Sequence, residues 1–351
     1  MEQLGNLSTM LDLMIRPAFA VKDGKIEYVN SGALSCLITT GFPVADLLDT
    51  GMEEYAGDWN GCLYLTVTVE GHRYGASVTR MEDFDLFILD EAASLPQLDA
   101  LALAARELRE PLSGIILASN RIIQQSGQEE AVAELNQSLY QMLRLVNNMS
   151  DAARYTAETT PRMDLQDVTA IIREVFEKAE VLTEKCSVNV CFSCTEESVI
   201  SLADPEKLER AVYNILSNAI KFTPAGGTVE ANLTRKGNHL CLTVTDTGSG
   251  ISDKILGNVF HRYQRQPALE ESRQGIGLGM VLIRAAAAAH GGTVLVQRCG
   301  DTGTRLTMTL SIRKRLNGNL GSHRLKVDYA GEYDHGLTEL SDVIPASYYK
   351  S

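Results

Sequence analysis

The sequence predicts a multidomain α+β protein: a small mixed domain, a two-helix hairpin and a C-terminal α/β sandwich. Three observations predict this order. Short alternating strand-like runs fill the first part of the chain, two apolar heptad patterns follow, and helical and strand patterns punctuated by glycine occupy most of the rest. We therefore expect domains over residues 1–93, 94–158 and 159–315, and a tail over residues 316–351.

Composition and charge narrow the class of protein. The 351 residues are 44% apolar and 22% charged, which suits a protein with substantial cores. A net charge of −13 argues against a nucleic-acid-binding surface, because phosphate binding needs a basic face. No apolar run reaches the roughly 20 residues of a membrane span, and no signal peptide is visible. We expect a cytoplasmic protein.

The first domain has strand patterns at both ends and short helices between them. Strands are expected over residues 18–21, 26–29, 62–69, 74–79 and 84–89. A turn over residues 22–25 joins the first two strands, and a helix is expected to start at Asn30-Ser31. This order resembles a PAS domain, a sensory fold found ahead of signalling kinases. An unspecialised α+β dimerisation domain is the alternative.

Two helices are expected between residues 94 and 158. Apolar residues recur at steps of three and four along both, which is the spacing of a coiled-coil seam. The seam of the second helix consists of Val132, Leu135, Leu139, Met142, Val146, Met149 and Ala153. The sequence Ser126-Gly127-Gln128 separates the helices and predicts an antiparallel hairpin. Pairing two chains into a four-helix bundle would cover both seams, and packing against the third domain is the alternative.

The first helix contains the sequence Ala105-Arg106-Glu107-Leu108-Arg109-Glu110-Pro111-Leu112. It resembles the phosphoacceptor box of sensor histidine kinases, which implies that Glu107 is a candidate general base. Arg106 stands where that family carries the phosphorylated histidine, and no histidine occurs between His72 and His239. A guanidinium is permanently charged and accepts no phosphoryl group. Glu110 replaces the Thr or Asn that in this family positions water for removing phosphate from a partner. Both usual activities of the box, accepting a phosphoryl group and removing one from a partner, are therefore in question.

The third domain mixes helices and strands, as in an α/β sandwich with helices on one face of a mixed sheet. Asp204 is a good N-cap, with Pro205 at the first helical position. Helices are expected over residues 168–177, 204–222 and 279–289. Strands are expected over residues 188–192, 197–201, 229–233 and 240–245.

Polar residues on one of these helices predict half of a nucleotide site. Asn214 and Asn218 lie four residues apart on the same helix face, and Lys221 follows about one turn later. An amide oxygen is a hard ligand that suits Mg²⁺ bridging phosphates. The helix therefore predicts a metal-assisted phosphate site.

Two glycine motifs predict the other half. Asp246 ends a strand, and Gly248 and Gly250 let the backbone turn tightly and approach a ligand. A second motif leads directly into a helix and offers backbone N–H groups to phosphate. Its residues are Gly275, Gly277, Leu278 and Gly279.

These motifs resemble, in order, the N, G1 and G2 boxes of the ATPase superfamily that contains histidine kinases, gyrase and a heat-shock chaperone. The resemblance implies that Asn218, with Asn214 as a second candidate, coordinates Mg²⁺, and that Asp246 reads adenine. It also implies that the second glycine motif holds the phosphates of ATP. Residues 259–265 resemble the F box, which implies a lid contact from Phe260. The alternative is that the glycines form a packing turn and the asparagines are solvated, so that the pocket no longer binds a nucleotide.

We therefore expect a Mg-ATP-binding protein that resembles a two-component sensor histidine kinase. Arg106 favours a regulatory pseudokinase. An active kinase with another or a trans acceptor, and a non-catalytic partner-binding module, are the alternatives. The expected partners are a second copy of the chain through the hairpin, and a response regulator or another histidine kinase. The acidic, tyrosine-bearing residues 316–351 predict a flexible tail or a strap over another surface.

Overall fold

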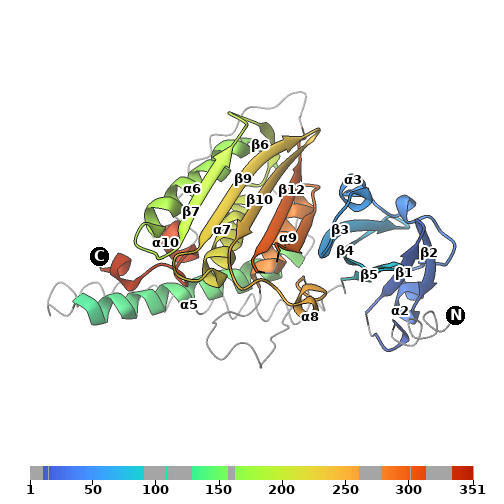
Figure 1. Cartoon of the computed structure of the whole chain (residues 1–351), viewed down its shortest axis with the longest axis horizontal. Helices are drawn as coiled ribbons and strands as arrows, with labels where there is room; N and C mark the ends of the chain where they lie inside the picture. Colours follow the sequence, from blue (N-terminus) through green and yellow to red (C-terminus); the bar gives the residue numbers. More distant parts are fainter. Residues whose placement is uncertain are drawn as a thin grey trace.

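The computed structural model describes the chain at residues 11–14, 16–90, 108, 112, 115, 129–156, 163–260, 278–300, 302–313 and 334–350. Two units with separate cores make up most of these residues, one in the N-terminal quarter and one in the C-terminal half. Figure 1 shows the two units with the long helix α5 (Glu129–Thr156) running beneath the larger one.

The N-terminal unit is a five-stranded antiparallel sheet in the order β2-β1-β5-β4-β3. Phe19 and Phe87 stack in its core with ring centroids 4.8 Å apart. Asn30 accepts a hydrogen bond from the Ala33 amide and so begins the first short helix. The elements of the N-terminal unit are β1 (Ala18–Lys22), β2 (Lys25–Val29), α2 (Ser31–Ser35), η1 (Val44–Asp46), α3 (Met52–Ala56), β3 (Cys62–Val69), β4 (His72–Arg80) and β5 (Asp85–Leu89). All five strands predicted here are confirmed.

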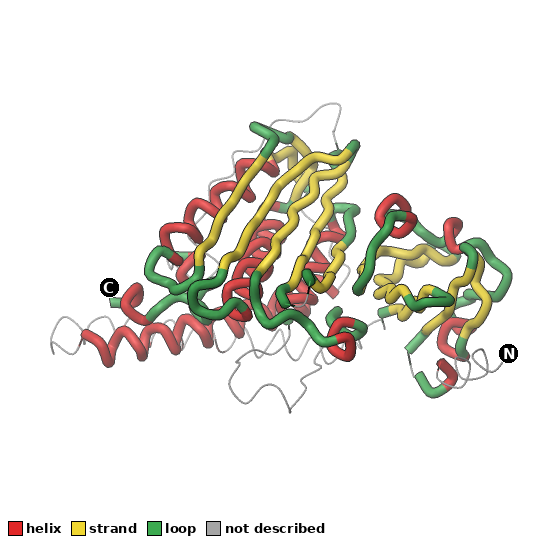
Figure 2. Tube along the Cα trace, viewed as in Figure 1, coloured by secondary structure: helices red, strands yellow, loops and turns green. Residues whose placement is uncertain are grey.

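The C-terminal unit is an α/β sandwich, as predicted, with helices on one face of a sheet in the order β11-β12-β10-β9-β7 (Figure 2). The strands are β7 (Asn189–Cys194), β9 (Thr228–Lys236), β10 (His239–Asp246), β11 (Val294–Arg298) and β12 (Thr304–Ser311), and β6 (Asp164–Asp167) and β8 (Ile200–Ala203) form a separate pair. The helices are α6 (Val168–Thr183), α7 (Pro205–Phe222), the short α8 (Asp253–Leu256) and α9 (Gly279–Ala289). Strands β6, β11 and β12 were not among the predicted elements.

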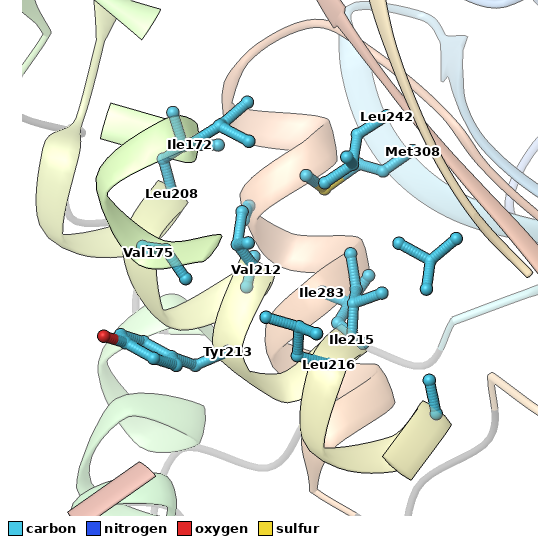
Figure 3. Packing of buried hydrophobic residues seen from close by; sticks show 14 of the residues in the cluster. Ile172, Val175, Leu208, Val212, Tyr213, Ile215, Leu216, Leu242, Ile283 and Met308 are labelled. Carbon is cyan, nitrogen blue, oxygen red and sulfur yellow. The ribbon is translucent and has the colours of Figure 1, made fainter. Parts of the chain in front are cut away.

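Helix α7 lies at the centre of this unit. It begins where Asp204 accepts a hydrogen bond from the Lys207 amide, and its apolar stripe is buried. Figure 3 shows Val212, Ile215 and Leu216 of α7 packed among side chains of α6, α9 and the sheet. Because α7 is fixed on several sides, its polar residues have defined positions.

The two sheets join edge to edge into one ten-stranded sheet. Strand β3 pairs antiparallel with β11, and Leu63 lies opposite Leu295. Gly61, just before β3, has φ +111°, and a Cβ there would overlap the Val296 carbonyl oxygen. The close approach of the two units therefore requires glycine at this position.

Helix α5 confirms the second helix of the predicted hairpin. Of its seam residues, Val132, Leu139 and Val146 are buried, whereas Leu135 and Met142 are 46% and 44% exposed. The heptad positions of α5 thus fall into two groups. The buried group packs within the chain, whereas Leu135 and Met142 remain exposed. Leu108, Leu112 and Ile115 are helical, and the remainder of the first predicted helix lies outside the described residues.

Residues 334–350 pack over another surface, as in the strap alternative, and do not form a flexible tail. Helix α10 (His335–Glu339) and the 3-10 helix η2 (Ala346–Tyr349) pack against α5, α6 and α7. Leu340, Ile344 and Tyr349 are buried in the main core, and this burial orders a segment whose sequence lacks periodicity.

Among the helices in the described part of the chain, none combines the length and the apolar character that a membrane crossing requires.

Candidate nucleotide site

The two asparagines of α7 meet the start of α9. The Asn214 side chain donates from Nδ2 to the Arg210 carbonyl at 2.9 Å, which leaves its oxygen pointing away from that turn. A Cβ on Gly279 would lie 3.0 Å from Asn214 Oδ1 and 3.6 Å from Asn218 Nδ2. The half-buried Asn218 also contacts Met280 Sδ at 4.0 Å. The structure therefore brings the asparagines of α7 together with Gly279, the last glycine of the motif that leads into α9.

Asp246 is buried at the end of β10. One carboxylate oxygen, Oδ1, accepts hydrogen bonds from the Gly248 amide at 2.8 Å and the Thr304 amide at 3.2 Å. Burial raises the pKa of Asp246, and these hydrogen bonds offset part of the rise. The Thr304 side chain also hydrogen-bonds to this carboxylate. The side chain is thus oriented by the turn after β10 and by Thr304 of β12.

The turn after Asp246 depends on its glycines. A Cβ on Gly248 would overlap the Phe222 carbonyl oxygen at the end of α7, and Gly250 has φ +71°. The Ser249 amide donates to the same carbonyl at 3.4 Å. The turn is therefore seated on the C-terminal end of α7, where the half-buried Lys221 lies in the last turn.

The start of α9 has the features of an anion site. Leu278 occupies the N-cap position, and its apolar side chain makes no capping hydrogen bond to the first N–H groups of the helix. The Leu278 side chain is buried with Ala152, Val281 and Leu282, and so points toward α5. Gly275 and Gly277 lie outside the described residues.

Phe260 is fully buried in the structure. Its ring lies 5.4 Å from the ring of Tyr64 on β3 of the N-terminal unit. The contact links the residues after α8 to the neighbouring unit, so the structure gives Phe260 a packing role. The sequence had suggested a lid contact, and any contact with nucleotide stays a prediction. Arg106 and Glu107 lie outside the described residues.

One ion pair at the boundary of the two units escaped the sequence analysis. Arg284 of α9 donates from Nη1 to both carboxylate oxygens of Asp90 at 2.7 Å, and its guanidinium lies 5.1 Å from the centroid of the Tyr64 ring. Tyr64 also donates to Asp90 at 2.6 Å. The sequence signal that could have identified it is a lone arginine within the otherwise apolar residues 279–289, because an arginine that such a helix buries needs a partner. The helix that begins at Gly279 is thereby tied to the end of β5.

His290 ends α9 as a neutral structural residue. Its Nε2 accepts a hydrogen bond from the Asp204 amide at 3.0 Å, and its Nδ1 lies 2.7 Å from the Ala286 carbonyl. Burial lowers its pKa. The histidine joins the end of α9 to the start of α7.

Two family models match the chain. The His Kinase A (phospho-acceptor) domain matches residues 97–158, and the histidine kinase-, DNA gyrase B- and HSP90-like ATPase matches residues 203–314. The second match contains α7, the Asp246 turn and α9. The chain belongs to the sensor histidine kinase family.

Curated histidine kinases align with most of this family member. The histidine protein kinase DivJ of Caulobacter vibrioides is 27% identical over 354 residues, covering 87% of this chain and 58% of DivJ. The sensor protein KdpD of Clostridium acetobutylicum is 27% identical over 207 residues, covering 57% of this chain and 23% of KdpD. The chain thus spans less than two thirds of the length of these relatives.

One solved structure has the same fold over part of its length. The full-length structure of ShkA in complex with AMPPNP aligns with a TM-score of 0.51 and 23% identity, covering 62% of this chain and 46% of ShkA. At this identity the similarity concerns the fold alone.

Proposed function

We propose that this histidine kinase family member binds Mg-ATP between α7, the Asp246 turn and the start of α9, and that it acts as a regulatory pseudokinase. The observation that carries the proposal is the convergence of Asn214 and Asn218 on Gly279, because it sets both side-chain amides beside a helix start whose N-cap residue makes no capping bond. Hard oxygen ligands and free N–H groups are the donors that Mg²⁺ and phosphate require.

The residues present fit both groups. Asp246 Oδ2 would accept a hydrogen bond from the exocyclic amine of adenine, since Oδ1 is already bonded to two backbone amides. Asn218, with Asn214 behind it, would hold Mg²⁺ through an amide oxygen, and Lys221 lies one turn further along the same helix. Bound Mg²⁺ would neutralise part of the phosphate charge. Asn214 has no carboxylate to activate water, so we expect slow hydrolysis of free ATP.

Calorimetry tests the binding site. We expect Asp246→Asn and Asn218→Ala each to weaken Mg-ATP binding by about tenfold or more, because each removes a polar contact to the ligand. Asn232→Ala is the matched control, since Asn232 is a half-buried asparagine on β9 whose side chain bonds only to neighbouring strand residues, Glu230 and Ser193, in the described structure. Equal affinity in the wild type and both site variants would disprove this site.

Isotope labelling tests the pseudokinase assignment. Arg106 occupies the acceptor position of the box, so the protein incubated with γ-labelled ATP should gain no acid-labile, base-stable phosphate. Arg106→His should restore some labelling if Glu107 and the rest of the box are competent, because a positioned nucleophile gains greatly from proximity. Phosphohistidine on the unmodified chain would refute the pseudokinase assignment and favour a kinase with another acceptor.

We further propose a homodimer through the hairpin. The exposed seam residues Leu135 and Met142 support it, because an apolar stripe of this spacing favours helix pairing. Changing both to Glu should give a monomer in light scattering with unchanged helix content. Leu139→Glu is a poor test, because Leu139 is 2% exposed and its substitution would disrupt the core. A wild-type monomer at every concentration would contradict the dimer.

Residues 1–93 are proposed to be a PAS-like sensory domain. Strands β1 and β2, short helices and then β3 to β5 support this assignment, since they follow the order that resembled PAS in the sequence. The contact of this unit with α9 suggests how it would act. A signal that alters the Asp90–Arg284 pair would reach the helix whose start holds phosphate. A response regulator or another histidine kinase is the proposed partner in signalling.

A further inference from the structure

Residues 334–350, called the strap below, lie between helix α5 and helices α6 and α7 of the ATPase unit. In Figure 1 α10 and the C-terminal end of the chain lie beside α5 at the end of that unit. The strap follows the region that matches the ATPase family, which ends at residue 314. None of the residues assigned above to nucleotide binding or to the acceptor box lies in it.

On one side the strap is bonded to α5. Two glutamines of α5 donate to its backbone: Gln137 to the Ser341 and Ile344 carbonyls at 3.1 and 2.8 Å, and Gln141 to the Ser341 carbonyl at 3.2 Å. Three further contacts extend along the helix. They are Asn136 to the Tyr349 carbonyl at 3.0 Å, Arg144 to Asp342 at 2.6 Å, and Tyr140 against the Tyr349 ring at 4.9 Å.

On the other side the strap is bonded to the ATPase unit. His335 lies 2.6 Å from Glu209 of α7 and packs edge-on against the Tyr213 ring. Lys178 of α6 pairs with Asp334 at 2.9 Å. A Cβ on Gly336 would lie 2.9 Å from the Lys178 side chain, so the strap approaches α6 closely at this glycine.

Glu339 joins the two sides. It is 0% exposed, and its carboxylate oxygens lie 3.6 Å from Arg144 of α5, Arg210 of α7 and His335. Arg210 in turn pairs with Asp151 of α5. A buried ion cluster adds little net stability, but it fixes geometry, because losing one member leaves a charge without its partner. The cluster therefore sets the register of α5 against α7.

The strap depends on both of its partners. Helix α10 has five residues, too few to be stable alone, so its conformation comes from packing. Conversely, α5 meets the rest of the ATPase unit mainly at its C-terminal end, where Ala152 packs on Leu278 and Val281 of the α9 start. The strap supplies the contacts along the preceding turns of α5.

We propose that residues 334–350 are an intramolecular clamp that fixes the second hairpin helix to the ATPase unit and holds the two as one rigid body. Release of the strap frees α5 to move relative to α7 and α9. In a chain of this family the clamp would govern the distance between the acceptor helices and the nucleotide, a consequence that rests on the proposed function. The clamping itself does not depend on ATP binding.

Spin-label distances test the clamp in the full chain. Labels are attached through a ketone-bearing amino acid at the exposed positions Glu134 of α5 and Glu230 of β9, which leaves the native cysteines unlabelled. The full chain should give one narrow distance distribution. A chain ending at residue 333 should give a distribution at least about twofold broader, because α5 then samples several positions.

A second variant decides the question if removal of the strap also disturbs the core. Gln137→Ala combined with Arg144→Met removes contacts of α5 to the strap and leaves the contacts of the strap to α6 and α7 in place. It should broaden the distribution as well. Arg173→Met is the matched control, since Arg173 bonds to the Glu196 and Glu197 carbonyls away from the strap. A narrow distribution at the full-chain distance in either folded variant would overturn the clamp.

Calorimetry on the same proteins separates the clamp from the proposed function. If the full chain binds Mg-ATP, release of the strap should change its affinity by about threefold or more, because α5 packs on the start of α9. If the full chain binds no nucleotide, the proposed function fails while the distance measurement still decides the clamp.

Discussion

Replacing Asp90 by alanine would leave Arg284 buried between the two units without its carboxylate. The Arg284 side chain is 4% exposed and donates to both Asp90 oxygens at 2.7 Å. Tyr64 would lose its acceptor at the same time. The substitution therefore leaves two donors unsatisfied at the place where β3 meets β11.

Breaking a buried ion pair from one side costs about 3–5 kcal/mol. We expect the lower end, about 3 kcal/mol, because the Asp90 side chain is 20% exposed and water enters from that side. At 1.4 kcal/mol per factor of ten, the two units should separate about 100-fold more readily. Arg284→Met should cost less, about 1 kcal/mol, because the remaining carboxylate is partly hydrated and lies 3.7 Å from Arg16.

Amide hydrogen exchange along the β3–β11 pairing measures this separation directly, because local opening exposes those amides. The double variant Asp90→Ala, Arg284→Met should regain about 2 kcal/mol relative to the sum of the single variants. Asp49→Ala is the control, since Asp49 forms an exposed pair with Arg73 inside the N-terminal unit. Unchanged exchange at β3 and β11 in Asp90→Ala would refute the view that this pair holds the units together.

Two further predictions concern backbone approach and pH. Gly61→Ala should speed exchange at β11 by at least about tenfold, because its Cβ would collide with a carbonyl of that strand, whereas Gly71→Ala, at a turn with open space, should not. The clamp should be firmest between about pH 4.5 and 6.5. Burial alone would lower the pKa of His335 and raise that of Glu339, but their charged partners reverse both shifts. The His335 contribution is present below pH 6.5 and lost as pH rises through its raised pKa, and the Glu339 contribution is present above pH 4.5 and lost as pH falls through about 2. The label distribution should therefore be broader at pH 8.5 than at pH 5.5, and an equal width would contradict the role of His335.

Local patterns in the sequence predicted most of the fold. Asp204 with Pro205 predicted the start of α7, the alternating runs predicted the strands of the N-terminal unit, and the spacing of Asn214 and Asn218 predicted one polar face of the candidate site. These features depend on residues a few positions apart, whose side chains meet as soon as a helix or strand forms. The heptad pattern of α5 predicted a buried face for the same reason.

The tertiary structure alone decided how these parts meet. The β3–β11 pairing is made by backbone groups, which leave no side-chain signature in an edge strand. Arg284 and Asp90 are 194 residues apart, and Glu339 joins helices whose arginines lie far from it along the chain. From sequence alone, a charged residue is expected to be exposed, because burial of an unpaired charge is too costly. Such a residue is buried only where the fold brings charged partners to it, as at Arg284 and Glu339.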